Sequence, residues 1–400
     1  MNNKIAKKIT IHYSAAFFVF FAAFCMIRSF ISVYLLDRGF SYTQAGIITG
    51  IHMLAAAIIQ PNFALILDHF PKGLHHFIAF CCIPAVICSL LTFFLPANLF
   101  VFILLYIIFA VCEVGLLSLM VSVGMEYVNA GVPINAGLGR GFGSIGYAAA
   151  NFLLGGLIVR YGSPVSHKLN IILMLIFAVV IITMPDPETL KSGTRQDDSE
   201  KTTVRSDNLF TFLRTNSIFA LFTLSVVFVF FGHCFVNTYL PNVAAQFGLG
   251  SDFTGAMNAL AAGLELIPMM MYAKISKKIS PLNLLCISAV FFTVKILTAA
   301  LATNGTGIVI SQLMQLLAYA IYSMPSIYFA NQAVQPQNRV MAQGLLIGAS
   351  EIGFTIGSLV GGAVLDHHTI RVLLWMGVCV SAVGSAMMIA AVTQFRQKSA

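Results

Sequence analysis

The chain has 400 residues, of which 58% are hydrophobic and only 9% are charged, and its mean hydropathy is +0.90. A soluble domain needs about 25% charged residues to cover its surface. This composition therefore excludes a water-soluble protein and indicates a lipid environment.

Apolar segments of membrane-spanning length recur from end to end, separated by short polar breaks. The basic segment 1–10 leads directly into the first of them without a cleavage site, so we interpret that segment as a span and not as a signal peptide. In chain order the predicted spans are 12–35, 43–67, 77–95, 100–124, 140–160, 168–184, 217–241, 253–272, 281–302, 306–332, 341–364 and 370–393. Because a backbone in lipid must satisfy its hydrogen bonds internally, the sequence predicts an all-α membrane protein with twelve transmembrane helices.

Lysine and arginine are divided unequally between the two sides of the predicted bundle. If the amino terminus is cytoplasmic, only Arg38, Arg160, Lys168 and Arg371 fall on the opposite side. This positive-inside bias predicts that both termini are cytoplasmic. The formal net charge of +8 then reflects orientation in the cytoplasmic membrane, and no nucleic-acid partner is expected.

The polar segment 185–216 divides the chain into two halves. It is mixed in charge and poor in aromatic residues, which predicts a cytoplasmic linker between one bundle at 1–184 and another at 217–400. NFLLGGLIVRYG at 151–162 resembles GSLVGGAVLDHH at 357–368, and Pro61 matches Pro268 at nearly the same offset. These matches predict a duplicated six-helix unit, with two bundles facing each other across a cavity as in secondary transporters.

The stretch GLGRGFGSIG at 137–146 contains the G-x-G-x-x-G pattern of dinucleotide-binding turns. Such a turn follows a strand and needs an acidic residue about 20 positions later, whereas here a membrane span precedes it and position 161 is tyrosine. We therefore expect no cofactor, and no cluster with metal-ligand spacing predicts a metal. Helical spacing instead predicts a small-residue face for close packing beside a polar face directed at a cavity. The polar face comprises Arg140, Ser144, Tyr147 and Asn151.

Similar polar rows occur on several other predicted spans. A single polar residue often serves only to join two helices, but rows on several spans favour a shared aqueous cavity. The candidate substrate-binding residues are Arg140, Tyr147, Asn151, His233, Asn237, Glu265, Gln312, Gln315, Tyr319 and Tyr322. Amides, hydroxyls and aromatic faces of this kind suit an uncharged, hydroxyl-rich ligand.

Ionisable residues inside the predicted spans are the sharpest signal. Each costs about 2.5–3.5 kcal/mol at the centre of a span, so each requires a partner or a function. The candidates for proton coupling are Glu265, Lys295, Glu351, Glu113 and Arg28. The alternative is a buried ion pair that only fixes helix register. Asp68 and Lys72, between the second and third spans, are interpreted as a gating loop, and His52 as a packing residue.

Three stretches resemble the major facilitator superfamily, and in particular its oligosaccharide–proton symporter branch, which includes lactose permease. They are QPNFALILDHFPK at 60–72, GRGFGSIGYAAA at 139–150 and AGLELIPMMMYAKISKKISPLNLLCISAVFFTVKIL at 262–297. The resemblance implies two six-helix bundles. It also implies that Arg140 binds substrate, that Tyr147 stacks against it and that Glu265 links substrate to proton. Gln315 stands where the branch has histidine, so galactoside specificity does not follow.

The sequence thus predicts a secondary active transporter that moves a sugar-like or nucleoside-like solute by proton-coupled symport. Proton-driven efflux of a drug-like or sugar compound is an alternative, and a transporter-like membrane sensor is an alternative of a different class. An enzyme is not expected, because the sequence has neither an H-E-x-x-H nor a G-x-S-x-G motif. The expected partners are the solute, protons and the lipid bilayer, and the expected state is a monomer.

Overall fold

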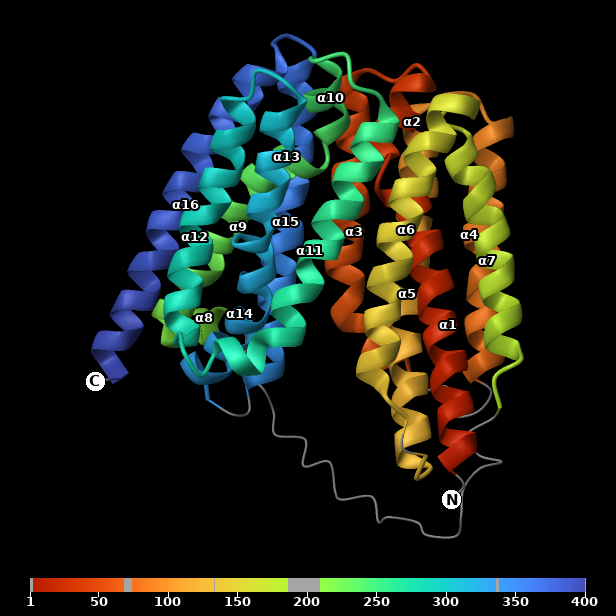
Figure 1. Ribbon diagram of the computed structural model, residues 1–400, viewed down its shortest axis with the longest axis horizontal. Helices are drawn as coiled ribbons and strands as arrows, with labels where there is room; N and C mark the ends of the chain where they lie inside the picture. The colour runs from red at the N-terminus through yellow and green to blue at the C-terminus, as the bar shows by residue number, and fades with distance from the viewer. Residues whose placement is uncertain (1–2, 68–73, 133, 186–208, 336–337, 400) are drawn as a thin grey trace.

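The computed structural model describes residues 3–67, 74–132, 134–185, 209–335 and 338–399, and within them the chain is helical throughout. The amino-terminal half contains α1 (Asn3–Arg28), α2 (Ile31–Asp37), α3 (Tyr42–Leu67), α4 (Leu74–Phe94), α5 (Leu99–Asn129), α6 (Ala136–Tyr161) and α7 (Val165–Ile182). The carboxy-terminal half contains α8 (Leu209–Thr215), α9 (Ser217–Asn237), α10 (Leu240–Ala245), α11 (Ser251–Ile275), α12 (Pro281–Ala300), α13 (Gly305–Leu313), the 3₁₀ turn η2 (Met314–Leu316), α14 (Tyr319–Ala333), α15 (Arg339–Leu365) and α16 (Ile370–Ser399). Figure 1 shows two bundles side by side.

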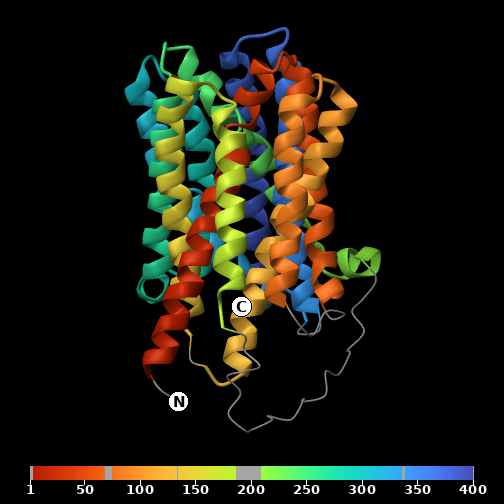
Figure 2. The ribbon, with the colours of Figure 1, turned by 90° about the vertical axis from the view of Figure 1, so that its right-hand side faces the viewer.

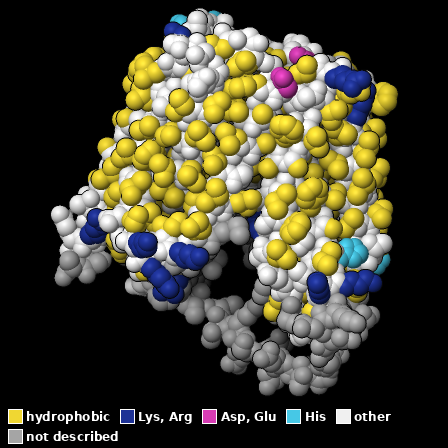
Figure 3. Space-filling model, viewed as in Figure 1, with side chains coloured by type: hydrophobic (Ala, Val, Ile, Leu, Met, Phe, Trp, Pro, Cys, Tyr) yellow, Lys and Arg dark blue, Asp and Glu magenta, His cyan; other side chains and the backbone are white. Residues whose placement is uncertain are grey.

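The predicted membrane fold is confirmed. In the described part of the chain, 11 helical segments are long and apolar enough to cross a membrane. The helix α11, which has more polar residues, is a further long helix that is not among these 11. Together they make two bundles of six long helices each. Figure 3 shows hydrophobic side chains covering the middle of one face, with lysine and arginine near its two rims.

Short polar residues start several of these helices by capping free backbone N–H groups. The Asn98 side chain accepts from the Phe100 N–H at 3.0 Å at the start of α5, and Asn135 accepts from the Leu138 N–H at 2.9 Å at the start of α6. Such caps satisfy donors that have no partner inside the helix. The polar breaks in the sequence therefore mark the span ends.

Two predicted spans are interrupted at equivalent places. The first breaks between α1 and α2, and the seventh breaks between α9 and α10. Just before each break a cysteine thiol lies close to a hydroxyl four residues on: Cys25 Sγ is 3.5 Å from Ser29 Oγ, and Cys234 Sγ is 3.3 Å from Thr238 Oγ1. The same thiol–hydroxyl contact, at corresponding positions of the two halves, supports the duplication inferred from the sequence.

The predicted linker 185–216 is helical at its end, because α8 occupies Leu209–Thr215. The ring of Phe212 on α8 packs edge-on against Phe219 of α9 with centroids 5.7 Å apart. This aromatic contact and the burial of Phe212 hold α8 against α9. Figure 2 shows this short helix near the end of the molecule where both termini lie.

The two bundles meet at the end away from the termini, where α3 packs on α15 and α6 packs on α11. A Cβ atom on Gly46 would lie 3.1 Å from the Gly362 Cα atom, and a Cβ atom on Gly155 would lie 3.0 Å from the Gly255 Cα atom. Backbones this close leave no room for a passage. At the opposite end, Figure 3 shows the surface hollowed between the bundles.

Candidate functional site

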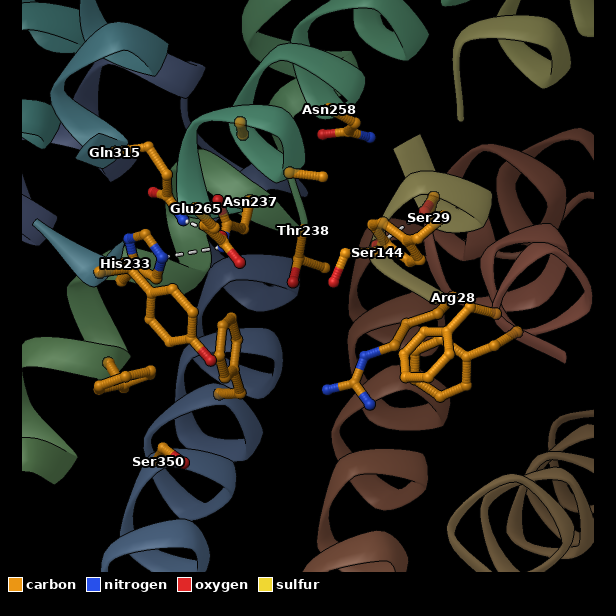
Figure 4. A pocket seen from close by; sticks show the side chains of 18 of the residues that line it. Arg28, Ser29, Ser144, His233, Asn237, Thr238, Asn258, Glu265, Gln315 and Ser350 are labelled. Carbon is orange, nitrogen blue, oxygen red and sulfur yellow. Dashed lines mark hydrogen bonds between the residues drawn. The ribbon is translucent and has the colours of Figure 1, made fainter. Parts of the chain in front are cut away.

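A cavity of about 340 Å³ lies between the two bundles. Figure 4 shows polar side chains from both bundles directed into it. Its lining comprises Phe21, Phe24, Arg28, Ser29, Met53, Arg140, Ser144, Tyr147, Phe230, His233, Asn237, Thr238, Asn258, Ala261, Ala262, Glu265, Gln315, Tyr319, Ser350, Glu351 and Phe354. Hydroxyls, amides and charges alternate with aromatic rings, as in sites that orient small polar molecules.

A continuous chain of hydrogen bonds forms the carboxy-terminal wall. Gln315 Nε2 donates to Glu265 Oε1 at 2.7 Å, and Lys295 Nζ donates to Gln315 Oε1 at 2.6 Å. Lys295 Nζ also lies 3.3 Å from Asn237 Oδ1, and Asn237 Nδ2 lies 2.9 Å from His233 Nε2. Gln315 thus joins a carboxylate to a fully buried ammonium group without direct contact between the charges. Because every link is a directional hydrogen bond, losing one member changes the position of the others.

One ion pair crosses the cavity from bundle to bundle. Arg28, at the end of α1, places its Nη2 atom 3.3 Å from Glu351 Oε1 on α15. Figure 4 shows the Arg28 guanidinium pointing across the space toward the other bundle. The guanidinium also lies over the Phe24 ring, 5.3 Å from its centroid. The pair therefore restrains the relative position of the two bundles at the level of the cavity.

The amino-terminal wall contains hydroxyls and a second arginine. Tyr147 Oη lies 3.0 Å from Ser29 Oγ, which fixes both groups at the cavity surface. The Arg140 guanidinium stacks over Phe21 at 4.4 Å. Arg140 lines the cavity, and among the described residues no carboxylate lies within ion-pair distance of it.

Most of the predicted substrate-binding residues line this cavity, but three do not. Asn151, Gln312 and Tyr322 are buried in the protein interior. Asn151 Nδ2 donates to the Tyr147 carbonyl at 3.0 Å, which is a local helix contact. The lining includes Arg140, Tyr147, His233, Asn237, Glu265, Gln315 and Tyr319.

The predicted proton-coupling residues divide into two groups. Glu265, Glu351 and Arg28 line the cavity, and Lys295 lies directly behind it. Glu113 is instead buried inside the amino-terminal bundle, with its Oε2 atom 3.5 Å from His52 Nε2. The gating-loop residues Asp68 and Lys72 lie outside the described residues.

Sequence reasoning missed part of the lining. Ser29 and Thr238 reach the cavity because the helices break beside them, and nothing in the apolar runs marks those breaks except the matching spacing of Cys25 and Cys234. The aromatic residues Phe21, Phe24, Phe230 and Phe354 also line the cavity. Their residue type is common on lipid-facing surfaces, so the sequence alone does not distinguish them.

The sequence from residue 10 to residue 376 matches the model of the MFS_1 like family. The chain belongs to this family of major facilitator superfamily transporters. Two curated relatives are the uncharacterized MFS-type transporters of Mycobacterium tuberculosis strains CDC 1551 / Oshkosh and ATCC 25618 / H37Rv, each 25% identical over 169 residues. That match covers 42% of this chain and spans 24% of each relative's length.

Solved structures of transporters share the fold of this MFS_1-like chain. The crystal structure of the nucleoside transporter NupG has a TM-score of 0.80 at 17% identity and covers 96% of this chain and 98% of NupG. The structure of the POT family transporter PepTSo has a TM-score of 0.75 at 9% identity and covers 98% of both chains. At these identities the likeness shows the shared fold and no more.

Proposed function

We propose that this MFS_1-like protein is a proton-coupled symporter of the oligosaccharide–proton type. It carries a sugar-like or nucleoside-like solute across the cytoplasmic membrane by alternating access. The supporting observation is the cavity of about 340 Å³ whose polar lining comes from both bundles. A solute bound there contacts both halves at once, so their rocking motion exposes it to one side and then to the other.

The chemistry of the lining favours a hydroxyl-rich solute. Asn237, Asn258, Ser144 and Ser29 supply neutral donors and acceptors, and Tyr319 supplies an aromatic face. This combination suits a sugar ring or a nucleoside, whose hydroxyls form hydrogen bonds while its apolar faces pack on rings. The structural likeness to NupG, which is named a nucleoside transporter, points in the same direction.

The charged residues support proton coupling at the same site. Glu265 receives one hydrogen bond from Gln315, and Glu351 holds Arg28 across the cavity. Protonation of either carboxylate removes a charge that organises one conformation, so it changes the relative free energies of the two carrier states. A proton gradient can thereby drive the solute uphill.

Uptake by liposomes that contain the purified protein tests this proposal. An inward proton gradient should drive accumulation of one member of a labelled panel of nucleosides and sugars. Glu265→Gln and Glu351→Gln should abolish the gradient-driven component. Asp252→Asn serves as a matched control, because Asp252 is an exposed carboxylate at the closed end. Full gradient-driven uptake by both glutamine variants would contradict the proposal.

A further inference from the structure

A second buried acid–base pair lies inside the amino-terminal bundle, apart from the cavity. His52 on α3 and Glu113 on α5 are each only 1% exposed. His52 Nε2 lies 3.5 Å from Glu113 Oε2. Neither residue lines the cavity, although Met53, the neighbour of His52, does. The pair is therefore close to the transport path and shielded from it.

The hydrogen bonds of His52 determine which of its nitrogen atoms carries a proton. His52 Nδ1 lies 2.9 Å from the Tyr106 carbonyl oxygen. A carbonyl oxygen only accepts hydrogen bonds, so Nδ1 must be the donor. In a neutral imidazole the other nitrogen, Nε2, is then a bare acceptor, and it faces Glu113.

An ionised Glu113 would leave this arrangement unsatisfied. Its oxygen and the bare Nε2 atom would be two acceptors facing each other, with an uncompensated charge in an apolar interior. Within the described part of the chain, neither His52 Nε2 nor Glu113 Oε1 has a hydrogen-bond partner. One additional proton between Oε2 and Nε2 resolves the conflict, as a neutral acid beside a neutral imidazole or as a carboxylate beside an imidazolium. In both forms the pair has no net charge.

We propose that the His52–Glu113 pair is a proton-binding site of the carrier, separate from the solute cavity. The inference rests on the proposed symport function and deepens it by locating a transported proton. Loss of the proton leaves one negative charge on the pair, and gain of the proton removes that charge.

Arg28 connects this pair to the two bundles. The Arg28 guanidinium is held by Glu351 of the other bundle and is also attracted by Glu113 of its own bundle. Glu113 also contributes to the electrostatic environment of Tyr106 and Cys112 on α5, and the Tyr106 hydroxyl lies 3.2 Å from His167 Nε2 on α7. Arg28 is thus the permanent cation that responds to the charge of the pair.

The proton state of the pair therefore sets the strength of the contact between the bundles. With the proton bound, the His52–Glu113 pair has no net charge and does not compete for Arg28, so the Arg28–Glu351 ion pair holds. With the proton released, Glu113 competes with Glu351 for the same guanidinium, and the ion pair loosens. This gives a physical link between proton release and the return of the empty carrier.

Two transport measurements separate coupling from binding. Glu113→Gln fixes the pair in its uncharged form, because the amide can donate to His52 Nε2. We expect this variant to keep solute exchange at equal pH within about threefold of the wild type and to lose accumulation driven by a proton gradient. Tyr106→Phe is the matched control, because it leaves intact the backbone carbonyl that holds His52. Glu265→Gln, in the cavity, should lose exchange as well.

Proton release from the purified protein gives a readout that does not depend on the solute. In weakly buffered detergent solution, an alkaline jump should release about one proton fewer from Glu113→Gln than from the wild type. If Glu113→Gln fails to reach the membrane, His52→Leu replaces it, because leucine has no atom that can accept or donate the shared proton. Equal proton release, or unchanged gradient-driven accumulation, would overturn the inference. Loss of coupling in Glu265→Gln alone would support the proposed function and reject this site.

Discussion

The close contact between α6 and α11 provides a matched pair of variants on neighbouring residues of one helix. A Cβ atom on Gly155 would lie 3.0 Å from the Gly255 Cα atom and 3.1 Å from the Asp252 Cα atom. A Cβ atom on Gly156 would meet nothing within 4 Å. Gly155→Leu should therefore prevent closure at this end of the molecule, and Gly156→Leu should not.

The magnitude follows from the atoms that a new side chain would meet. They belong to the backbone, which moves less easily than the end of a side chain, and overpacking of this kind costs about 1–3 kcal/mol. The two bundles can avoid this cost by separating at this end. Since about 1.4 kcal/mol corresponds to a factor of ten, the ratio of open to closed molecules should rise by roughly 5–150-fold.

Spin labels at the exposed positions Asp37 and His368, one on each bundle at the closed end, report this change. Pulsed electron resonance should show a longer distance in Gly155→Leu than in the parent protein, in a background without the exposed Cys379. Gly156→Leu should match the parent. The reasoning fails if the two leucine variants give the same distance distribution.

Two further predictions concern contacts at the closed end and in the cavity wall. Slight burial acts to raise the pKa of Asp366, but hydrogen bonds from the Thr43 side chain and from the Thr43 and Tyr42 backbone N–H groups outweigh it and lower the pKa below its ordinary value of 3.8. The ionised Asp366 carboxylate therefore stabilises the closed end fully above pH 3.8, and this stabilisation is lost as the pH falls through the lowered pKa. Asp366→Asn should open this end at neutral pH. An unchanged distance between the spin labels at Asp37 and His368 would contradict this. Lys295→Met should lower the free energy of unfolding by about 1–3 kcal/mol, because Gln315 Oε1 loses the ammonium donor that lies 2.6 Å away. An unchanged melting temperature in detergent would contradict this and show that water replaces the ammonium group.

The sequence alone predicted the spans because lipid imposes a long apolar run on each one. It also identified the costly ionised residues, but not their partners, which come from helices distant in the chain. The Arg28–Glu351 pair joins residues in different halves, and Glu113 pairs with His52, which the sequence had marked only for packing. Pairing of this kind depends on tertiary arrangement and not on spacing.

The predicted substrate-binding residues Gln312, Gln315, Tyr319 and Tyr322 form a row at helical spacing along the tenth predicted span, and this row shows why helical spacing failed in detail. The row assumes one straight helix, but α13 ends at Leu313 and α14 begins at Tyr319, with the turn η2 between them. This change of helical phase leaves Gln315 and Tyr319 at the cavity and buries Gln312 and Tyr322 elsewhere. The break between α13 and α14 thus separates residues that the helical spacing of the sequence places on one face.

Solute counterflow tests the central claim most directly. Liposomes containing the purified protein are loaded with an unlabelled nucleoside or sugar, and the labelled solute is added outside at equal pH. The account predicts transient accumulation of the label for one member of the panel, and its loss in Glu265→Gln. A solute that raises the melting temperature of the protein but never moves across the membrane would contradict the account and indicate a receptor.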